Sequence, residues 1–266
     1  MRVALCQFSA GDDPDANLAA IVEQAGKAAA DGARLVVFPE AAMARFGGDL
    51  AAVAQPLDGP WASAIIDAAR ALGVVIVAGM FVPAPGGRVA NTLLVAGAGK
   101  PLHYDKIHLF DAFGYAESDT VAPGRAPLLA EVDGVTLGFA TCYDVRFPEL
   151  FVDLALRGAQ VIVLPTSWGA GPGKLAQWET LVRARALDAT TWLLAVDQAA
   201  PELPGAAGAP LGIGHSMIVG PDGAEHGRLD ERPGMLVADL DPGAVAEVRG
   251  TIPVLANRAY RLLPPP

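Results

Sequence analysis

Cys142 lies where a predicted strand turns into a predicted helix, a position in which a side chain can act as a nucleophile. An apolar, β-prone stretch (Val135–Ala140) leads into it, and a helix-like stretch (Phe147–Arg157) follows. A thiol there can be exposed at the sheet edge, with a pKa lowered by the helix N-terminus. The alternative is a core residue. That is the simpler interpretation of the only other cysteine, Cys6, which sits inside the apolar first strand.

Glu40 follows a second predicted strand, Arg34–Phe38, and comes directly after Pro39, which cannot continue a strand ladder. A carboxylate at the end of a buried strand is poorly explained by packing. Partial burial there raises its pKa toward values that suit proton transfer. A surface glutamate that caps the next segment explains the position equally well.

Lys106 comes after a third predicted strand, between His103-Tyr104-Asp105 and Ile107-His108-Leu109-Phe110. Such a lysine can hold an oxyanion or stabilise a thiolate. Taken alone, the residue is better explained as a solvated lysine at the end of a strand.

Histidine is an alternative base for a cysteine nucleophile. The chain has four histidines, and His108 is two residues from Lys106, so that it could complete a Cys-His pair with Cys142. No CxxC, HxH or HExxH spacing is present, so the sequence predicts neither a metal site nor a cofactor.

The glycine-rich run Gly169–Lys174 superficially resembles a phosphate-binding loop. Trp168 stands in place of the first glycine of that motif, and Leu175 replaces the serine or threonine. Because Lys174 also replaces the last glycine of a dinucleotide fingerprint, the run predicts only a turn before a helix.

Composition limits the class of protein. The 266 residues are 52% hydrophobic, enough for a sizeable core, and the net charge is −10 without a basic cluster. This net charge argues against nucleic acid or an anionic membrane as a partner.

The sequence also predicts where the protein is located. No apolar run approaches 18 residues, and no leader peptide is recognisable. Two cysteines fit a reducing compartment, so we expect a cytoplasmic protein.

Strands and helices alternate along the chain, which predicts one α/β domain (residues 1–266) whose sheets are covered by helices. Hairpins are indicated at Gly97–Gly99 and at Asp133–Gly134. The other predicted strands are Arg2–Ser9, Val74–Val82, Val89–Val95, Pro101–Tyr104, Leu128–Val132, Val161–Leu164, Trp192–Val196, Ile213–Val219 and Met235–Leu240. The other predicted helices are Pro14–Asp31, Trp61–Leu72 and Leu175–Thr191, and Asp105–Arg125 is expected to be a long loop.

Several separate motifs carry a family resemblance, in one order and with compatible spacing. They are Val36–Glu40, Tyr104–Asp111, Glu117–Ser118, Val121–Gly124, Thr141–Glu149, Gly158–Pro165, Arg183–Asp188 and Gly214–Ser216. Together they resemble the nitrilase (carbon–nitrogen hydrolase) superfamily over nearly the whole chain. The chain is most similar to its Nit branch, because Tyr143-Asp144 follows the cysteine where nitrile-hydrolysing branches typically have Trp-Glu.

The resemblance implies a four-layer α-β-β-α sandwich whose subunits pair into a larger layered homodimer. It also implies a catalytic triad of Glu40, Lys106 and Cys142, with Glu117 as an accessory glutamate. The expected reaction is amide hydrolysis through a thioester, which requires no cofactor.

Substrate-binding residues are expected beside the cysteine. Arg146 can hold a substrate carboxylate bidentately, or it can form a structural salt bridge to Asp144 or Glu149. Trp168 either forms a wall of the pocket or is an interface or core aromatic. Tyr143 offers its backbone N–H to an oxyanion.

These expectations favour a small monoamide of a dicarboxylic acid, such as α-ketoglutaramate or deaminated glutathione. Hydrolysis of neutral amides, carbamoyl compounds or nitriles by the same triad is an alternative. A binding module without catalytic activity is another.

Overall fold

Alternating side chains of the strands build two sheets that pack face to face. The computed structural model describes residues 1–112, 114–201 and 209–259. In β1 (Arg2–Gln7), Val3 and Leu5 point into the core between the sheets, whereas Ala4 and Cys6 point to the helices on the outer face. This two-residue alternation follows from the pleat of a strand.

The first sheet takes most of its strands from the N-terminal half of the chain. Its order is β15-β1-β2-β3-β4-β5, with β8 paired to β4, and β1, β2 and β3 are parallel. Besides β1, its strands are β2 (Leu35–Val37), β3 (Val75–Pro83), β4 (Val89–Ala96), β5 (Leu102–Asp105), β8 (Val121–Ala122) and β15 (Gly234–Asp239). Because β15 pairs antiparallel with β1, the C-terminal half of the chain closes this sheet.

The second sheet has the order β14-β13-β12-β11-β10-β9. Its central strands β10 (Val135–Phe139), β11 (Val161–Thr166) and β12 (Trp192–Asp197) are parallel. Its outer strands are β9 (Leu129–Val132), β13 (Met217–Val219) and β14 (Glu225–Arg228). A two-stranded hairpin of β6 (Asp111–Ala112) and β7 (Tyr115–Ala116) stands apart from both sheets.

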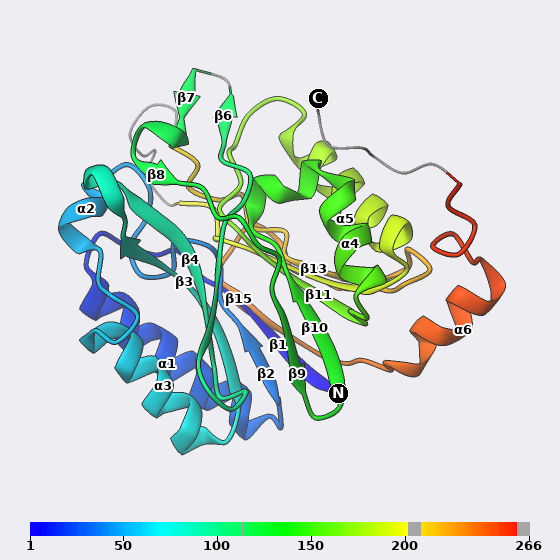
Figure 1. Ribbon diagram of the computed structural model, residues 1–266. Helices are drawn as coiled ribbons and strands as arrows, with labels where there is room; N and C mark the ends of the chain where they lie inside the picture. The colour runs from blue at the N-terminus through cyan, green and yellow to red at the C-terminus, as the bar shows by residue number, and fades with distance from the viewer. Residues whose placement is uncertain (113, 202–208, 260–266) are drawn as a thin grey trace.

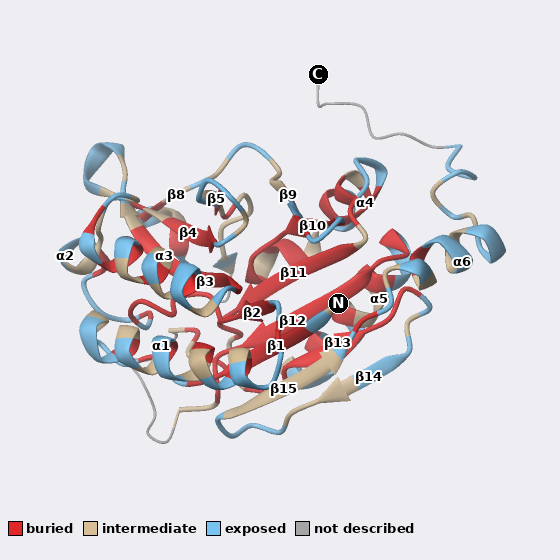
Figure 2. Ribbon diagram, turned by 90° about the horizontal axis from the view of Figure 1, so that it is seen from below, coloured by how far each residue is buried: buried red, intermediate tan, exposed pale blue. Residues whose placement is uncertain are grey.

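Helices cover the outer face of each sheet and complete four layers (Figure 1). The first sheet carries α1 (Pro14–Ala30) and α3 (Pro60–Leu72), and the second carries α4 (Pro148–Leu156) and α5 (Lys174–Ala189). Figure 2 shows the buried strands between helices whose outward sides are exposed. The predicted α-β-β-α sandwich is therefore confirmed.

The predicted hairpins are confirmed, and most predicted elements differ from the observed ones by only one or two residues. The short elements α2 (Leu50–Val53), α6 (Gly243–Thr251) and β14 were not predicted, and the expected loop 105–125 contains β6, β7, β8 and the 3-10 turn η2 (Glu117–Asp119). A further 3-10 turn, η1, spans Pro85–Gly87.

The predicted strand Ile213–Val219 was too long, because β13 starts only at Met217. Side chains take the backbone N–H groups that a longer strand would use in its ladder. The N–H of Ile213 donates to Asp197, and that of Ser216 donates to Gln7.

No helix within the described ranges has both the length and the apolar character that a membrane crossing needs.

Candidate active site

Glu40 lies just beyond the end of β2 and is completely buried. Its Oε2 accepts the backbone N–H of Ser167 at 2.8 Å, and its backbone carbonyl accepts the side-chain amide of Gln198 at 2.8 Å. Burial raises the pKa of Glu40; Lys106 opposes this shift, and the nearby Glu117 carboxylate adds to it. The predicted direction of the shift is confirmed, and the surface alternative is excluded.

A glycine in the neighbouring strand lets the backbone around Glu40 approach β3 closely. A β-carbon at Gly79 would lie 2.5 Å from the amide nitrogen of Ala41 and 2.8 Å from the carbonyl oxygen of Pro39. No real side chain tolerates such contacts with backbone, so the position of Glu40 depends on this glycine.

Lys106, just after β5, places its ammonium group between two carboxylates. Its Nζ lies 2.9 Å from Glu40 Oε1 and 2.8 Å from Glu117 Oε2, and only 2% of the side chain is exposed. Burial alone would lower the pKa of Lys106, but Glu117 and Glu40 together outweigh it and raise the pKa well above its ordinary value. The alternative of a solvated lysine was wrong.

Asn91, in the middle of β4, joins the two carboxylates from the other side. Its Nδ2 donates to Glu40 Oε1 at 2.7 Å and to Glu117 Oε1 at 3.0 Å. The N–H of Phe110 donates to Glu117 Oε2 at 2.7 Å. Asn91 was not predicted, although an amide side chain inside a largely apolar strand was a usable signal.

Cys142 begins the 3-10 turn η3 (Cys142–Arg146) in a left-handed backbone conformation, with φ of 46°. Its side chain is buried, and Sγ lies 3.7 Å from the carbonyl oxygen of Ser167. Burial, and then the Glu40 carboxylate, raise the pKa of the Cys142 thiol well above its ordinary value. The expected lowering of this pKa was wrong, because burial and Glu40 determine its direction. The next α-helix begins only at Pro148, so Cys142 does not lie at its N-terminus. The thiol therefore needs a base.

Asp144 fastens the cysteine turn to the segment that carries Lys106. Its Oδ2 accepts the N–H of Thr141 at 2.8 Å and the hydroxyl of Tyr104 at 2.7 Å. Its Oδ1 accepts the N–H of His108 at 3.0 Å. One buried carboxylate thus holds residues on both sides of Lys106.

His108 belongs to this scaffold. Its Nδ1 lies 2.7 Å from Asp144 Oδ1, and its ring stacks on Phe147 with centroids 3.7 Å apart. It is not among the residues that line the pocket around Cys142. The geometry therefore favours Glu40 over His108 as the group that serves the thiol.

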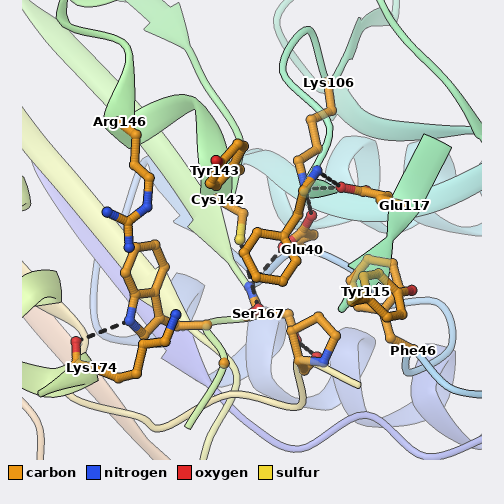
Figure 3. A pocket seen from close by; sticks show the side chains of 14 residues that line it. Glu40, Phe46, Lys106, Tyr115, Glu117, Cys142, Tyr143, Arg146, Ser167 and Lys174 are labelled. Atoms are coloured by element: carbon orange, nitrogen blue, oxygen red, sulfur yellow. Dashed lines mark hydrogen bonds and ion pairs between the residues drawn. The ribbon is translucent and has the colours of Figure 1, made fainter. Parts of the chain in front are cut away.

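A pocket opens at Cys142 (Figure 3). All seven predicted site residues line it, namely Glu40, Lys106, Glu117, Cys142, Tyr143, Arg146 and Trp168. The residues that sequence reasoning missed are Phe46, Phe110, Tyr115, Ser167, Gly169, Lys174 and Pro210. The predicted turn before α5 is confirmed, and its last member, Lys174, belongs to the pocket wall.

Arg146 extends along an aromatic wall of the pocket. Its Nη2 donates to Gln177 Oε1 at 2.7 Å, and its Cζ lies 5.2 Å from the ring centre of Trp168 and 5.9 Å from that of Tyr143. Within the described part of the chain Arg146 forms no salt bridge, so the alternative of a structural pair with Asp144 or Glu149 is not observed.

Trp168 is held at both its backbone and its ring. Its N–H donates to Asp197 Oδ1 at 2.8 Å, and its indole Nε1 donates to the carbonyl oxygen of Lys174 at 3.0 Å. Burial raises the pKa of Asp197 well above its ordinary value, against the effect of the N–H groups of Ile213 and Trp168. Trp168 therefore forms part of the pocket wall, and the buried Asp197 holds its backbone in place.

No group of three or more histidine, cysteine or acidic side chains among residues 1–112, 114–201 and 209–259 is arranged to hold a metal ion.

A family model described as "Carbon-nitrogen hydrolase" matches residues 2–250. The chain belongs to the carbon–nitrogen hydrolase family. Among its relatives are a protein from Mycobacterium tuberculosis known simply as a hydrolase, and the deaminated glutathione amidase of Escherichia coli O157:H7. The first is 49% identical over 97% of this chain and 95% of its own length, and the second is 36% identical over 98% of both chains.

Solved structures of carbon–nitrogen hydrolases agree with the fold. Saccharomyces cerevisiae Nit3, a member of the nitrilase superfamily, has 26% identity and a TM-score of 0.85, with 98% of this chain and 97% of that chain covered. A mutant amidase from Nesterenkonia has 28% identity and a TM-score of 0.81, with 97% of this chain and 94% of that chain covered. In that structure the acetamide moiety of fluoroacetamide is covalently attached to the active-site cysteine. The protein is therefore a cysteine-dependent carbon–nitrogen hydrolase of the amidase type.

Proposed function

We propose that the protein hydrolyses a small amide that carries a carboxylate away from the scissile bond. The observation that carries this proposal is the placement of Arg146 in the same small pocket as Cys142, with its guanidinium on an aromatic wall rather than in a salt bridge to Asp144 or Glu149. A guanidinium is suited to bind a carboxylate bidentately. The amide end would then face Cys142, Glu40 and Lys106.

Acylation starts from a protonated thiol. Glu40 takes the proton of Cys142, and the thiolate attacks the amide carbon to form the C–S bond. Lys106 and the backbone N–H of Tyr143 stabilise the oxyanion, a contribution of about 3 kcal/mol for each such donor. When the C–N bond breaks, Glu40 returns the proton to the leaving nitrogen, which departs as ammonia.

Deacylation uses the same base. Glu40 takes a proton from water as the hydroxide adds to the thioester, and the collapse of that intermediate breaks the C–S bond. The proton returns to Cys142, and the carboxylic acid product leaves. In both steps Glu117 holds Lys106 in place through its 2.8 Å ion pair.

The names of relatives support this substrate class. They include the deaminated glutathione amidase and an omega-amidase of Danio rerio that is 29% identical over 97% of this chain. α-Ketoglutaramate and deaminated glutathione are therefore the first substrates to test, with glutamine and simple nitriles as comparisons. Ammonia release that is much faster from the two acidic amides supports the proposal, and equal or faster release from nitriles contradicts it.

The role of Arg146 has its own test. Arg146→Ala should raise KM for acidic amides far more than for neutral amides, because only the former lose a charged contact. Equal effects on both kinds of amide would show that Arg146 does not bind the carboxylate.

We also propose that the protein is a cytoplasmic homodimer. Apolar side chains remain exposed over α4 and α5, where Leu156 is 59% and Leu187 is 46% exposed, and a partner subunit would cover them. Light scattering tests the dimer, and a monomer at micromolar concentration would contradict it.

The proposed cytoplasmic location agrees with the cysteines, because both are free thiols, which suits a reducing compartment. Cell fractionation tests the location.

A further inference from the structure

We propose that Lys174 is a second specificity-determining residue, and that the substrate carboxylate lies between Lys174 and Arg146. The inference rests on the proposed function and names the group that completes its acid-binding end. In Figure 3 both cations are on the side of the pocket away from Lys106 and Glu117, with Cys142 between the two sides.

Both cations lie close to one aromatic side chain. The Cζ of Arg146 lies 5.2 Å from the ring centre of Trp168, and the Nζ of Lys174 lies 5.9 Å from the same centre. The Lys174 Nζ is also 5.7 Å from the ring centre of Phe110. The indole Nε1 of Trp168 donates to the carbonyl oxygen of Lys174, so the ring near both cations is anchored at one of the two residues.

The two cations in the pocket repel each other. Partial burial lowers the pKa of Lys174, and the positive charge of Arg146 lowers it further. A substrate carboxylate close to both cations would offset this repulsion. The third cation of the pocket, Lys106, already has two carboxylates as partners and is not available to the acid group.

The position of Lys174 at the start of α5 is unfavourable for the stability of the folded protein. It is the first residue of α5, where the positive end of the helix dipole disfavours a cation. Gly173 provides no side-chain cap, and the first turn contains no acidic residue. A bound carboxylate would interact favourably both with Lys174 and with this end of the helix.

The test compares two amides of equal chain length, glutaramic acid and pentanamide, by ammonia release. Lys174→Gln should raise KM for glutaramic acid about 10-fold or more, as expected for the loss of a charged hydrogen bond. The kcat for glutaramic acid and both constants for pentanamide should change less than about two-fold. Lys100→Gln, at an exposed lysine in the β4–β5 turn, is the matched control and should change neither constant.

Thermal unfolding separates this effect from misfolding. Because Lys174 opposes the helix dipole, Lys174→Gln should melt at the same temperature as the wild type or higher. A raised KM in a variant of unchanged stability supports a binding role. An equal rise in KM for both amides, or no rise for either, overturns the inference.

A double-mutant cycle tests whether the two cations share one carboxylate. If they do, the rise in KM for Arg146→Gln/Lys174→Gln should be clearly smaller than the product of the two single effects. A full product of the single effects would mean that the two cations act independently, and would overturn the shared site. If the wild type shows no preference for glutaramic acid, the proposed function itself fails. If only Lys174→Gln lacks the selective effect, the further inference alone fails.

Discussion

The ammonium nitrogen of Lys106 lies 2.9 Å from Oε1 of Glu40, and both side chains are excluded from solvent. With Glu117 the site holds one cation and two carboxylates in a region of low polarity. Each charge in such a cluster depends on the others, since an unpaired buried charge is far more costly than a paired one. The cluster is therefore the centre of the proposed chemistry, and the loss of one of its charges should destabilise the folded protein.

Lys106→Met should destabilise the protein by about 3–5 kcal/mol, because it leaves two carboxylates buried without a counter-ion. Chemical denaturation measures the loss. Lys27→Met, which removes an exposed lysine paired with Glu23 on α1, is the control and should change stability little.

The loss in Lys106→Met should also depend on pH. Without the lysine, burial and mutual repulsion hold the pKa of Glu40 above its unfolded value, so proton uptake favours the folded state. The deficit should therefore shrink as the pH falls and grow as the pH rises through the folded pKa. A deficit that is constant with pH would contradict the electrostatic explanation.

On the acidic side of its pH profile (the acid limb), kcat/KM should follow the ionisation of Glu40. Because burial raises its pKa above the ordinary value of 4.5, Glu40 becomes a base only at higher pH. Activity should then rise with pH through that raised pKa. Glu40→Gln should lower kcat by about 10²- to 10⁴-fold and abolish this limb. A limb that persists in Glu40→Gln would assign it to another group.

Gly79→Ala should impair catalysis through the position of Glu40. The new methyl group would lie 2.5 Å from the Ala41 amide nitrogen, so the backbone must move, at a cost of about 1–3 kcal/mol. We expect a lower kcat together with a lower melting temperature. Gly26→Ala, inside α1 with no atom near the new carbon, is the matched control and should stabilise the helix slightly. A Gly79→Ala enzyme with normal kcat would show that Glu40 tolerates the shift.

His108→Ala should keep most of the wild-type kcat, because His108 contacts Asp144 and Phe147 and does not line the pocket. Its melting temperature should fall, since Asp144 loses a partner. Glu40→Ala should be inactive in the same assay. An inactive but folded His108→Ala would revive the Cys-His alternative.

Much of the site could be predicted because its residues sit in local contexts that are visible in the sequence. Glu40 follows a buried strand and a proline, and Cys142 stands at a turn between a strand and a helix. Those contexts, together with their order along the chain, identify the family. The direction of the thiol pKa was wrong because it depends on burial and on Glu40, which lies far from Cys142 in the sequence.

The missed residues contribute through tertiary contacts. Asn91 meets Glu40 and Glu117 only when β4 lies beside β3. Lys174 lines the same pocket as Trp168, whose indole donates to the carbonyl oxygen of Lys174. Asp144 appeared as a polar neighbour of the cysteine, but its partners Tyr104 and His108 lie more than thirty residues away. Periodicity and local propensity contain no information on such contacts.

The central claim is that Cys142 forms a thioester with the acyl part of an acidic amide. Wild-type protein and Cys142→Ala would be mixed with glutaramic acid, quenched in acid within one turnover, digested and analysed by mass spectrometry. The account predicts an adduct equal to the substrate mass less ammonia, on the wild-type peptide that contains Cys142 and nowhere in Cys142→Ala. Ammonia release without that adduct in a single-turnover time course, or an adduct on Cys6, would contradict it.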